Sequence, residues 1–196
     1  MKKIFTAVMM FCMAAAVAGC AQEQRPVSDV VYIQLSDRQI TVDGQSLTEG
    51  SIGGVSLSND IVYYREGQGR DYGEGSAEEA HGRQEADSHQ VITITQPGNY
   101  TVSGSLSRGQ IAIDLGRDSG RDSSAVVNLT LDNVDLTCTV APAIICYNAY
   151  ECGSYDTSSA SRDVDISSAG FNLILARDSE NNINGSHVAK IYKERT

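Results

Sequence analysis

The chain has 196 residues and a formal net charge of −10 at pH 7, from 25 acidic residues against 15 lysines and arginines. This excess of negative charge argues against nucleic acid and anionic lipid surfaces as partners, because both would repel the protein. It would also repel acidic polymers, unless a divalent cation bridges the two.

The N-terminus has the features of an export signal. Lys2 and Lys3 precede an apolar run over residues 4–17, and the small residues after it end at Cys20. This pattern predicts a lipoprotein signal peptide over residues 1–19, with Cys20 as the lipid-bearing mature N-terminus. A transmembrane anchor is disfavoured, because the run is shorter than the roughly 20 residues of a membrane span. Removal of the two lysines would take the net charge from −10 to −12. We therefore expect an exported protein, held at the outer membrane or cell surface by its lipid alone.

The patterns of the next segments predict a tether, leader strands and a capping helix. Residues 20–29 are polar and include a proline, so we expect a tether. Alternating apolar residues within 30–75 predict leader strands, followed by a glycine-rich loop. Residues 76–89 are rich in Ala and Glu and lack β-branched residues, which predicts a helix from 76 to 88. Such a helix would cap the open end of a following repeat.

Three side chains of that helix recur every four residues on one face: His81, Glu85 and His89. Imidazole and carboxylate groups at this spacing are typical of a metal site. We favour the capping role, because two imidazoles and one carboxylate leave no clear fourth ligand.

Residues 90–196 contain a recurring set of short strands. Alternating apolar runs are separated by small and polar turn residues. The unit is centred on Ile94, Leu129 and Leu173, with offsets of about 35 and then about 44 residues. A repeat of this size indicates a solenoid, here a parallel β-helix with these three residues in one buried column. A β-sandwich would explain the alternation but not the recurrence. The polar residues between them should face outward: Thr93, Asn128 and Asn172.

The predicted fold class is therefore all-β, a parallel β-helix of about three coils with N-terminal leader strands and a short capping helix. The third coil ends near residue 192, and only four residues follow it. We expect the coils over residues 90–196 to be incomplete at the C-terminus, with the poorest order after Gly170, because nothing remains to cover the last apolar face.

Several phrases between His81 and Tyr192 carry a family resemblance: ITITQPGNYTVSG, GQIAIDLG, AVVNLTLDNVDLTC, TVAPAIICYNAYECG and NNINGSHVAKIYK. This run resembles a family of secreted bacterial carbohydrate-binding proteins. The resemblance implies a right-handed, calcium-bearing β-helix that is similar in architecture to pectate lyases and binds plant-type polysaccharides, acidic ones included. Relatives continue well past the end of this chain. The resemblance assigns no ligand-contacting residue.

Acidic and amide residues gather at two predicted corners. Asp132, Asn133 and Asp135 lie at one, and Asp178 lies at the corresponding corner one coil later. Calcium binds roughly six to eight oxygen ligands and would relieve the repulsion between stacked carboxylates, so these four residues are the candidate calcium ligands. Asparagine ladders could instead stabilise the turns with no ion.

Three cysteines remain in the mature chain besides Cys20. Export permits disulfides. Cys138 and Cys152 flank the strand over residues 143–145, and Cys146 ends that strand, where members of the similar family carry a large apolar residue. We therefore expect a Cys138–Cys152 disulfide worth about 3 kcal/mol, with Cys146 free.

No catalytic residue is assigned. The chain shows neither a Ser-His-Asp order nor a paired-carboxylate motif. Its arginines lie mostly in loops and do not face a carboxylate cluster from an outward strand position. With no tryptophan and nine tyrosines, tyrosine would have to supply any flat surface for a sugar ring. The expected function is non-catalytic, calcium-dependent polysaccharide binding, with a polysaccharide lyase and a structural surface protein or adhesin as the alternatives.

Overall fold

The computed structural model describes residues 30–48, 50–62, 81–152, 158 and 163–186. This part of the chain is mostly β-structure with little helix, in agreement with the predicted all-β class. The elements are β1 (Val30–Leu35), β2 (Thr41–Val42), β3 (Gln45–Ser46), β4 (Ser51–Ile52), β5 (Val55–Ser58), α1 (Arg83–Asp87), β6 (Gln90–Ile94), β7 (Gly98–Leu106), β8 (Gly109–Asp114), the 3-10 helix η2 (Arg117–Arg121), β9 (Val127–Thr137), β10 (Ile144–Asn148), β11 (Phe171–Leu175) and β12 (Asn182–Asn184).

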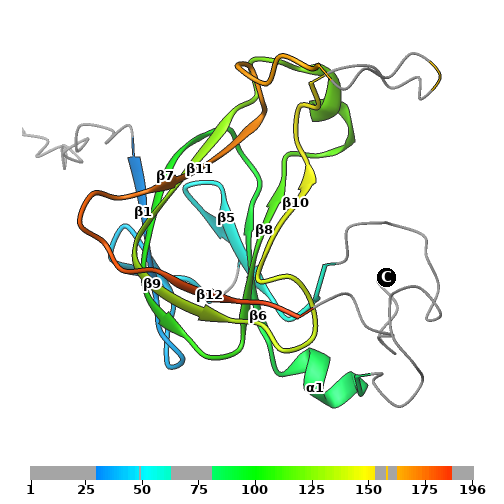
Figure 1. Ribbon diagram of the computed structural model, residues 1–196. Helices are drawn as coiled ribbons and strands as arrows, with labels where there is room; N and C mark the ends of the chain where they lie inside the picture. The colour runs from blue at the N-terminus through cyan, green and yellow to red at the C-terminus, as the bar shows by residue number, and fades with distance from the viewer. Residues whose placement is uncertain (1–29, 49, 63–80, 153–157, 159–162, 187–196) are drawn as a thin grey trace, which may run out of the picture.

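The strands form two sheets that enclose the core (Figure 1). Sheet A has the order β11-β9-β7-β1-β2-β3, and β12 also pairs with β9. Sheet B has the order β10-β8-β6-β5-β4. From β6 to β11 the chain alternates between the sheets, and each strand from β8 to β11 pairs in parallel with the strand two places earlier. A circuit is defined here as one strand of sheet B together with the segment of sheet A that follows it in the chain. Each circuit adds one layer to both sheets.

The leader strands cover the first circuit on both sheets. β1 pairs in parallel with β7, and β5 pairs antiparallel with β6. β1 also begins an antiparallel meander with β2 and β3, which turns at Asp43 and Gly44. Without these strands, the first circuit would present unpaired N–H and C=O groups along its edges.

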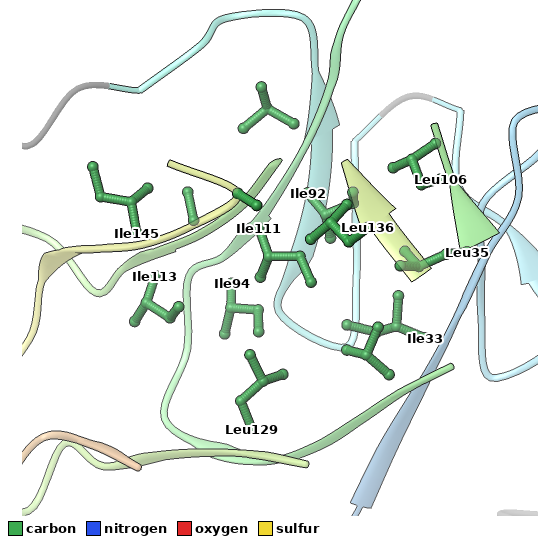
Figure 2. Packing of buried hydrophobic residues seen from close by; sticks show 14 of the residues in the cluster. Ile33, Leu35, Ile92, Ile94, Leu106, Ile111, Ile113, Leu129, Leu136 and Ile145 are labelled. Atoms are coloured by element: carbon green, nitrogen blue, oxygen red, sulfur yellow. The ribbon is translucent and has the colours of Figure 1, made fainter. Parts of the chain in front are cut away.

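The strand register corrects the predicted repeat by one strand. Leu129 pairs with Leu173 in sheet A, as expected, but its partner on the other side is Tyr100. Ile94 pairs with Ile113 in sheet B. Ile94 and Leu129 thus point toward one another from different walls of the core (Figure 2) and do not share a column.

The turns explain why the predicted repeat is offset by one strand. The turn at Pro97 takes the chain from sheet B to sheet A, whereas the turn at Asn133 is a bend inside β9. Polar and small residues mark both turns, so the local pattern does not separate them. Each bend in sheet A carries a left-handed residue, namely Gly104 (φ 94°), Asn133 (φ 56°) and Asp178 (φ 58°). These are the residue types that adopt this conformation at least cost.

In sheet A, buried and solvent-accessible residues alternate along the strand as predicted. In β9, Leu129 is fully buried while Asn128 and Thr130 on the other face are half-buried. Sheet B differs, because β8 is buried at five consecutive residues from Gly109 to Ile113. Both faces of β8 are therefore covered, whereas the outer face of sheet A remains accessible to solvent.

A buried glutamine joins the leader segment to the circuits. Gln110 is 0 % exposed. Its Oε1 accepts the Val62 N–H at 2.8 Å, and its Nε2 donates to the carbonyl oxygens of Val62 (3.0 Å) and Pro142 (2.9 Å). These bonds fix residue 62 against β8 and against the segment that precedes β10.

The helix is shorter than expected within the described residues. α1 begins at Arg83, and its N-cap Gly82 has an extended backbone (φ −74°, ψ 153°). Glycine at this position favours a break in the helix, so His81 lies outside it. The predicted start at residues 76–80 lies outside the described residues.

The last circuit leaves apolar side chains exposed. Leu173, Leu175 and Ile183 are 50 %, 65 % and 37 % exposed, although each pairs with a buried residue of β9. β11 is the terminal strand of sheet A among the described residues. The last described layer therefore exposes apolar side chains on β11 and β12.

Candidate functional site

A cavity of about 310 Å³ lies between η2 and the end of β10. We call it the η2 cavity. Its lining residues are Arg117, Asp118, Gly120, Arg121, Asn148, Ala149 and Glu151.

Backbone and side-chain hydrogen bonds hold both walls of the η2 cavity. Gly116 turns the chain after β8 with φ 85°, and the Ser119 hydroxyl donates to the Gly116 carbonyl at 2.6 Å. Asp114 Oδ1 accepts the Gly116 N–H (3.1 Å) and Asn148 Nδ2 (2.7 Å). The Leu115 N–H donates to the Asn148 carbonyl at 2.9 Å. Asp114 therefore ties η2 to β10, so the cavity is formed by the fold itself.

The lining of the η2 cavity combines donors and acceptors. Arg117 and Arg121 carry donors only, the carboxylates of Asp118 and Glu151 are acceptors, and the Asn148 amide is both. Among the described residues that line the cavity, two positive and two negative groups balance the charge. This set suits a compact, uncharged molecule with several hydroxyl groups.

A second feature is an asparagine ladder on the outer face of sheet A. Asn99, Asn128 and Asn172 occupy the same register on β7, β9 and β11. Asn128 Nδ2 donates to Asn99 Oδ1 at 3.0 Å, and Asn172 Nδ2 donates to Asn128 Oδ1 at 2.9 Å. An amide has two donor hydrogens and two acceptor lone pairs, so the ladder uses only half of the capacity of Asn128.

A second column runs beside the ladder. Tyr32, Thr101, Thr130 and Ile174 share one register across β1, β7, β9 and β11. Its two ends are the most accessible, with Tyr32 55 % and Ile174 42 % exposed. We call the ladder and this column together the outer strip.

The predicted calcium corner is a hydrogen-bonded pair of turns. Asn133 Oδ1 accepts the Glu180 N–H at 3.1 Å, and Asn181 Oδ1 accepts the Val134 N–H at 2.9 Å. Asp132 Oδ1 accepts Asn133 Nδ2 at 2.8 Å. The amide oxygens thus bind the backbone of the neighbouring circuit.

This geometry fits the alternative in which asparagines stabilise stacked turns. Among the described residues, no three His, Cys, Asp or Glu side chains gather closely enough to share a metal ion. Asp132, Asn133, Asp135 and Asp178 remain the candidate ligands for an ion that needs roughly six to eight oxygens. Calcium binding stays a prediction, and we assign no ion to this corner.

The two histidines and Glu85 form a structural network. His89 is 1 % exposed; its Nδ1 lies 2.9 Å from the Glu85 carbonyl, and its Nε2 accepts the Thr139 N–H at 3.2 Å. The Thr139 hydroxyl donates to Glu85 Oε1 at 3.0 Å, and His81 Nδ1 lies 3.1 Å from Glu85 Oε2. Because both nitrogens of His89 contact the backbone, this residue fastens α1 to the turn after β9. Burial lowers the pKa of His89.

The predicted disulfide is not formed in the structure, where Cys138, Cys146 and Cys152 are free thiols. Cys138 follows β9 and lies before β10, whereas Cys152 follows β10 and lies 3.8 Å from the Ser168 hydroxyl. The whole of β10 lies between the two cysteines along the chain, and their pairing stays a prediction. Cys146 is exposed, and desolvation, with a smaller effect of the Glu151 charge, raises the pKa of its thiol to about 11.

The predicted lipid anchor at Cys20 lies outside the described residues, so it stays a prediction. Within the part of the chain that the structure describes, no helix has the length and apolarity to cross a membrane.

The sequence did not identify the η2 cavity or the outer strip. For the η2 cavity the sequence does hold a local pattern, since Arg117 and Arg121 lie four residues apart after Gly116. Nothing local places Glu151 beside them, because it comes from the next circuit. For the outer strip, alternation places Asn128 and Asn172 outward, but only the register brings Tyr32 and Ile174 into line with them.

A family model described as "Carbohydrate-binding domain-containing protein" matches residues 88–158. This range includes the described residues that line the η2 cavity and the parts of the outer strip on β7 and β9. No curated protein and no solved structure matches the chain.

Proposed function

We propose that this protein binds carbohydrate without catalysis, and that the η2 cavity holds one sugar unit. The single observation that carries the proposal is this preformed cavity, with its balanced donors and acceptors, inside the segment that matches a carbohydrate-binding family.

The chemistry of the lining suits a sugar. Each hydroxyl group of a sugar both donates and accepts a hydrogen bond, so neighbouring hydroxyls need both kinds of partner. Arg117 and Arg121 supply donors in a planar fork, while Asp118 and Glu151 accept. A neutral unit preserves the charge balance, whereas an acidic unit would add a third carboxylate to the cavity.

The size of the cavity points to a single unit. Pockets for small molecules start at roughly 300 Å³, and the η2 cavity holds about 310 Å³. One ring with its hydroxyls is the ligand of that scale, so a polysaccharide would place one residue there and continue outside.

We further propose that the circuits form a parallel β-helix and that Cys20 anchors the chain to the cell envelope by lipid. The alternation of strands between two sheets and the parallel pairing within each sheet support the β-helix. The apolar leader before Cys20 supports the anchor. The binding domain would then be displayed outside the cell, attached by a polar tether.

The experiment measures glycan binding by the chain with Cys20→Ser, which removes the lipid site. We expect this chain, with its cavity unaltered, to show saturable binding to oligosaccharides on an array of neutral and acidic glycans. Arg121→Met should weaken it by about tenfold or more, because a hydrogen bond from a charged donor contributes about 1.5–3 kcal/mol. Arg177→Met, an exposed arginine that does not line the cavity, is the matched control.

Three outcomes would contradict the proposal. If no oligosaccharide binds, carbohydrate is not the ligand. If Arg121→Met and Arg177→Met bind equally well, the η2 cavity is not the site. Release of unsaturated products from an acidic polysaccharide would contradict the non-catalytic role and favour a lyase.

A further inference from the structure

We propose that the outer strip is a second carbohydrate contact, on which a neutral polysaccharide lies across the strands of sheet A. This inference rests on the proposed carbohydrate binding but concerns a different surface, outside the η2 cavity. Its residues are Tyr32, Asn99, Thr101, Asn128, Thr130, Asn172 and Ile174.

The strip is an extended surface and not a pocket. Tyr32 on β1 and Ile174 on β11 are separated by three strand spacings. At about 4.8 Å for each spacing, the column is about 14 Å long. It therefore offers contact to several consecutive sugar units.

The face that carries the strip is accessible, in contrast to sheet B. The outward residues of β9 are half-buried or exposed, and Asn172 and Ile174 on β11 are exposed. In β8 of sheet B, both faces are buried over residues 109–113. A ligand that lies flat on a sheet thus has access to sheet A.

The chemistry of the strip fits a neutral glycan. None of its side chains is charged at pH 7, although the whole chain carries a net charge of −10. Tyr32 and Ile174 provide apolar surface for the faces of sugar rings. The amides of the asparagine ladder and the threonine hydroxyls provide donors and acceptors for the sugar hydroxyls.

A protein partner fits this surface less well. A stable interface buries about 800 Å² on each partner around an apolar core. The middle of the strip holds threonines and amides, and its two apolar side chains stand at opposite ends. A flexible glycan needs neither a continuous apolar centre nor that area.

The test compares oligosaccharides of one to eight units with long polysaccharides, using the chain with Cys20→Ser. The double variant Tyr32→Ala/Ile174→Ala removes both apolar ends of the strip. We expect wild-type affinity for neutral glycans to rise with chain length. The double variant should lose about tenfold for the longest chains and keep its affinity for a single sugar.

Control variants separate a binding role from a folding defect. Ile166→Ala removes another exposed isoleucine, 71 % accessible and outside the strip, and should leave binding unchanged. Tyr32→Phe keeps the aromatic face and should restore most of the affinity that Tyr32→Ala loses. Thermal unfolding of each variant should match that of the parent chain.

The outcomes distinguish this inference from the proposed function. If the parent chain binds no glycan, the proposed function itself fails. If the parent chain binds glycans but the double variant binds long neutral chains equally well, the proposal for the outer strip is wrong. The proposal for the η2 cavity is not affected by that result. A preference for acidic chains, or a change of oligomeric state in the double variant without a change in glycan binding, would also overturn the strip.

Discussion

Replacement of Gln110 by Met tests how the leader segment is held to the circuits. Methionine is close to glutamine in size, so the substitution opens little cavity. It removes both partners of residue 62 and one partner of Pro142: the Val62 N–H loses its acceptor, and the two carbonyl oxygens lose their donor.

The expected loss follows from the burial of these groups. A buried polar group left without a partner costs about 1–3 kcal/mol. Val62 is 5 % exposed, while Pro142 is half-buried, so water replaces part of what its carbonyl loses. Together the orphaned groups should lower the free energy of unfolding by roughly 2–5 kcal/mol. For a chain of this length that corresponds to a fall in Tm of about 4–20 °C.

Urea and thermal unfolding followed by circular dichroism would measure this loss. Gln34→Met is the matched control, because Gln34 is exposed and its two hydrogen bonds with Ser103 lie at the surface. Water replaces those bonds, so the control should lose less than about 1 kcal/mol. Equal losses for the two variants would refute the reasoning, since burial would then not set the cost.

Four further predictions follow from single residues. Leu129→Ala should lower the free energy of unfolding by roughly 2–5 kcal/mol, because Leu129 is fully buried. His89 has a lowered pKa in the folded state; the unfolded chain therefore binds its proton first, and stability should fall as the pH drops below about 6.5. The reaction of native Cys146 with iodoacetamide should become about tenfold faster for each unit that the pH rises toward its raised pKa of about 11, because only the thiolate reacts. Buried Cys138 should react only after unfolding. Cys20→Ser should abolish lipid labelling and release the protein from membranes.

Each of these measurements has its control or contrary outcome. Asn128→Ala, on the outer face beside Leu129, should cost far less, and similar losses would contradict the register. His89→Gln should flatten the pH dependence of Tm; an unchanged slope would show that other groups cause it. Mass spectrometry of alkylated peptides would contradict the thiol assignment if Cys138 labels as fast as Cys146 in the native protein. Lipid that remains on the Cys20→Ser variant would exclude this anchor.

Local sequence was enough to predict which residues of β9 face inward. Strand alternation places Leu129 in the core and Asn128 on the outside, because successive side chains of a strand point to opposite faces. The predicted export signal is equally local, since it depends on composition over a short stretch, and it stays a prediction. The pairing of Leu129 with Leu173 was also predicted correctly, because both strands precede the same kind of bend.

Which strands stack and which side chains meet depends on contacts between segments far apart in the chain. The sequence pattern placed Ile94 in the layer beside Leu129, where the structure has Tyr100, since a turn between sheets and a bend within a sheet use similar residues. The cysteines show a related difference: in the structure Cys138 and Cys152 are free thiols, and the strand β10 lies between them along the chain. The η2 cavity and the outer strip depend on contacts between residues from different circuits, which strand register sets and local sequence does not encode.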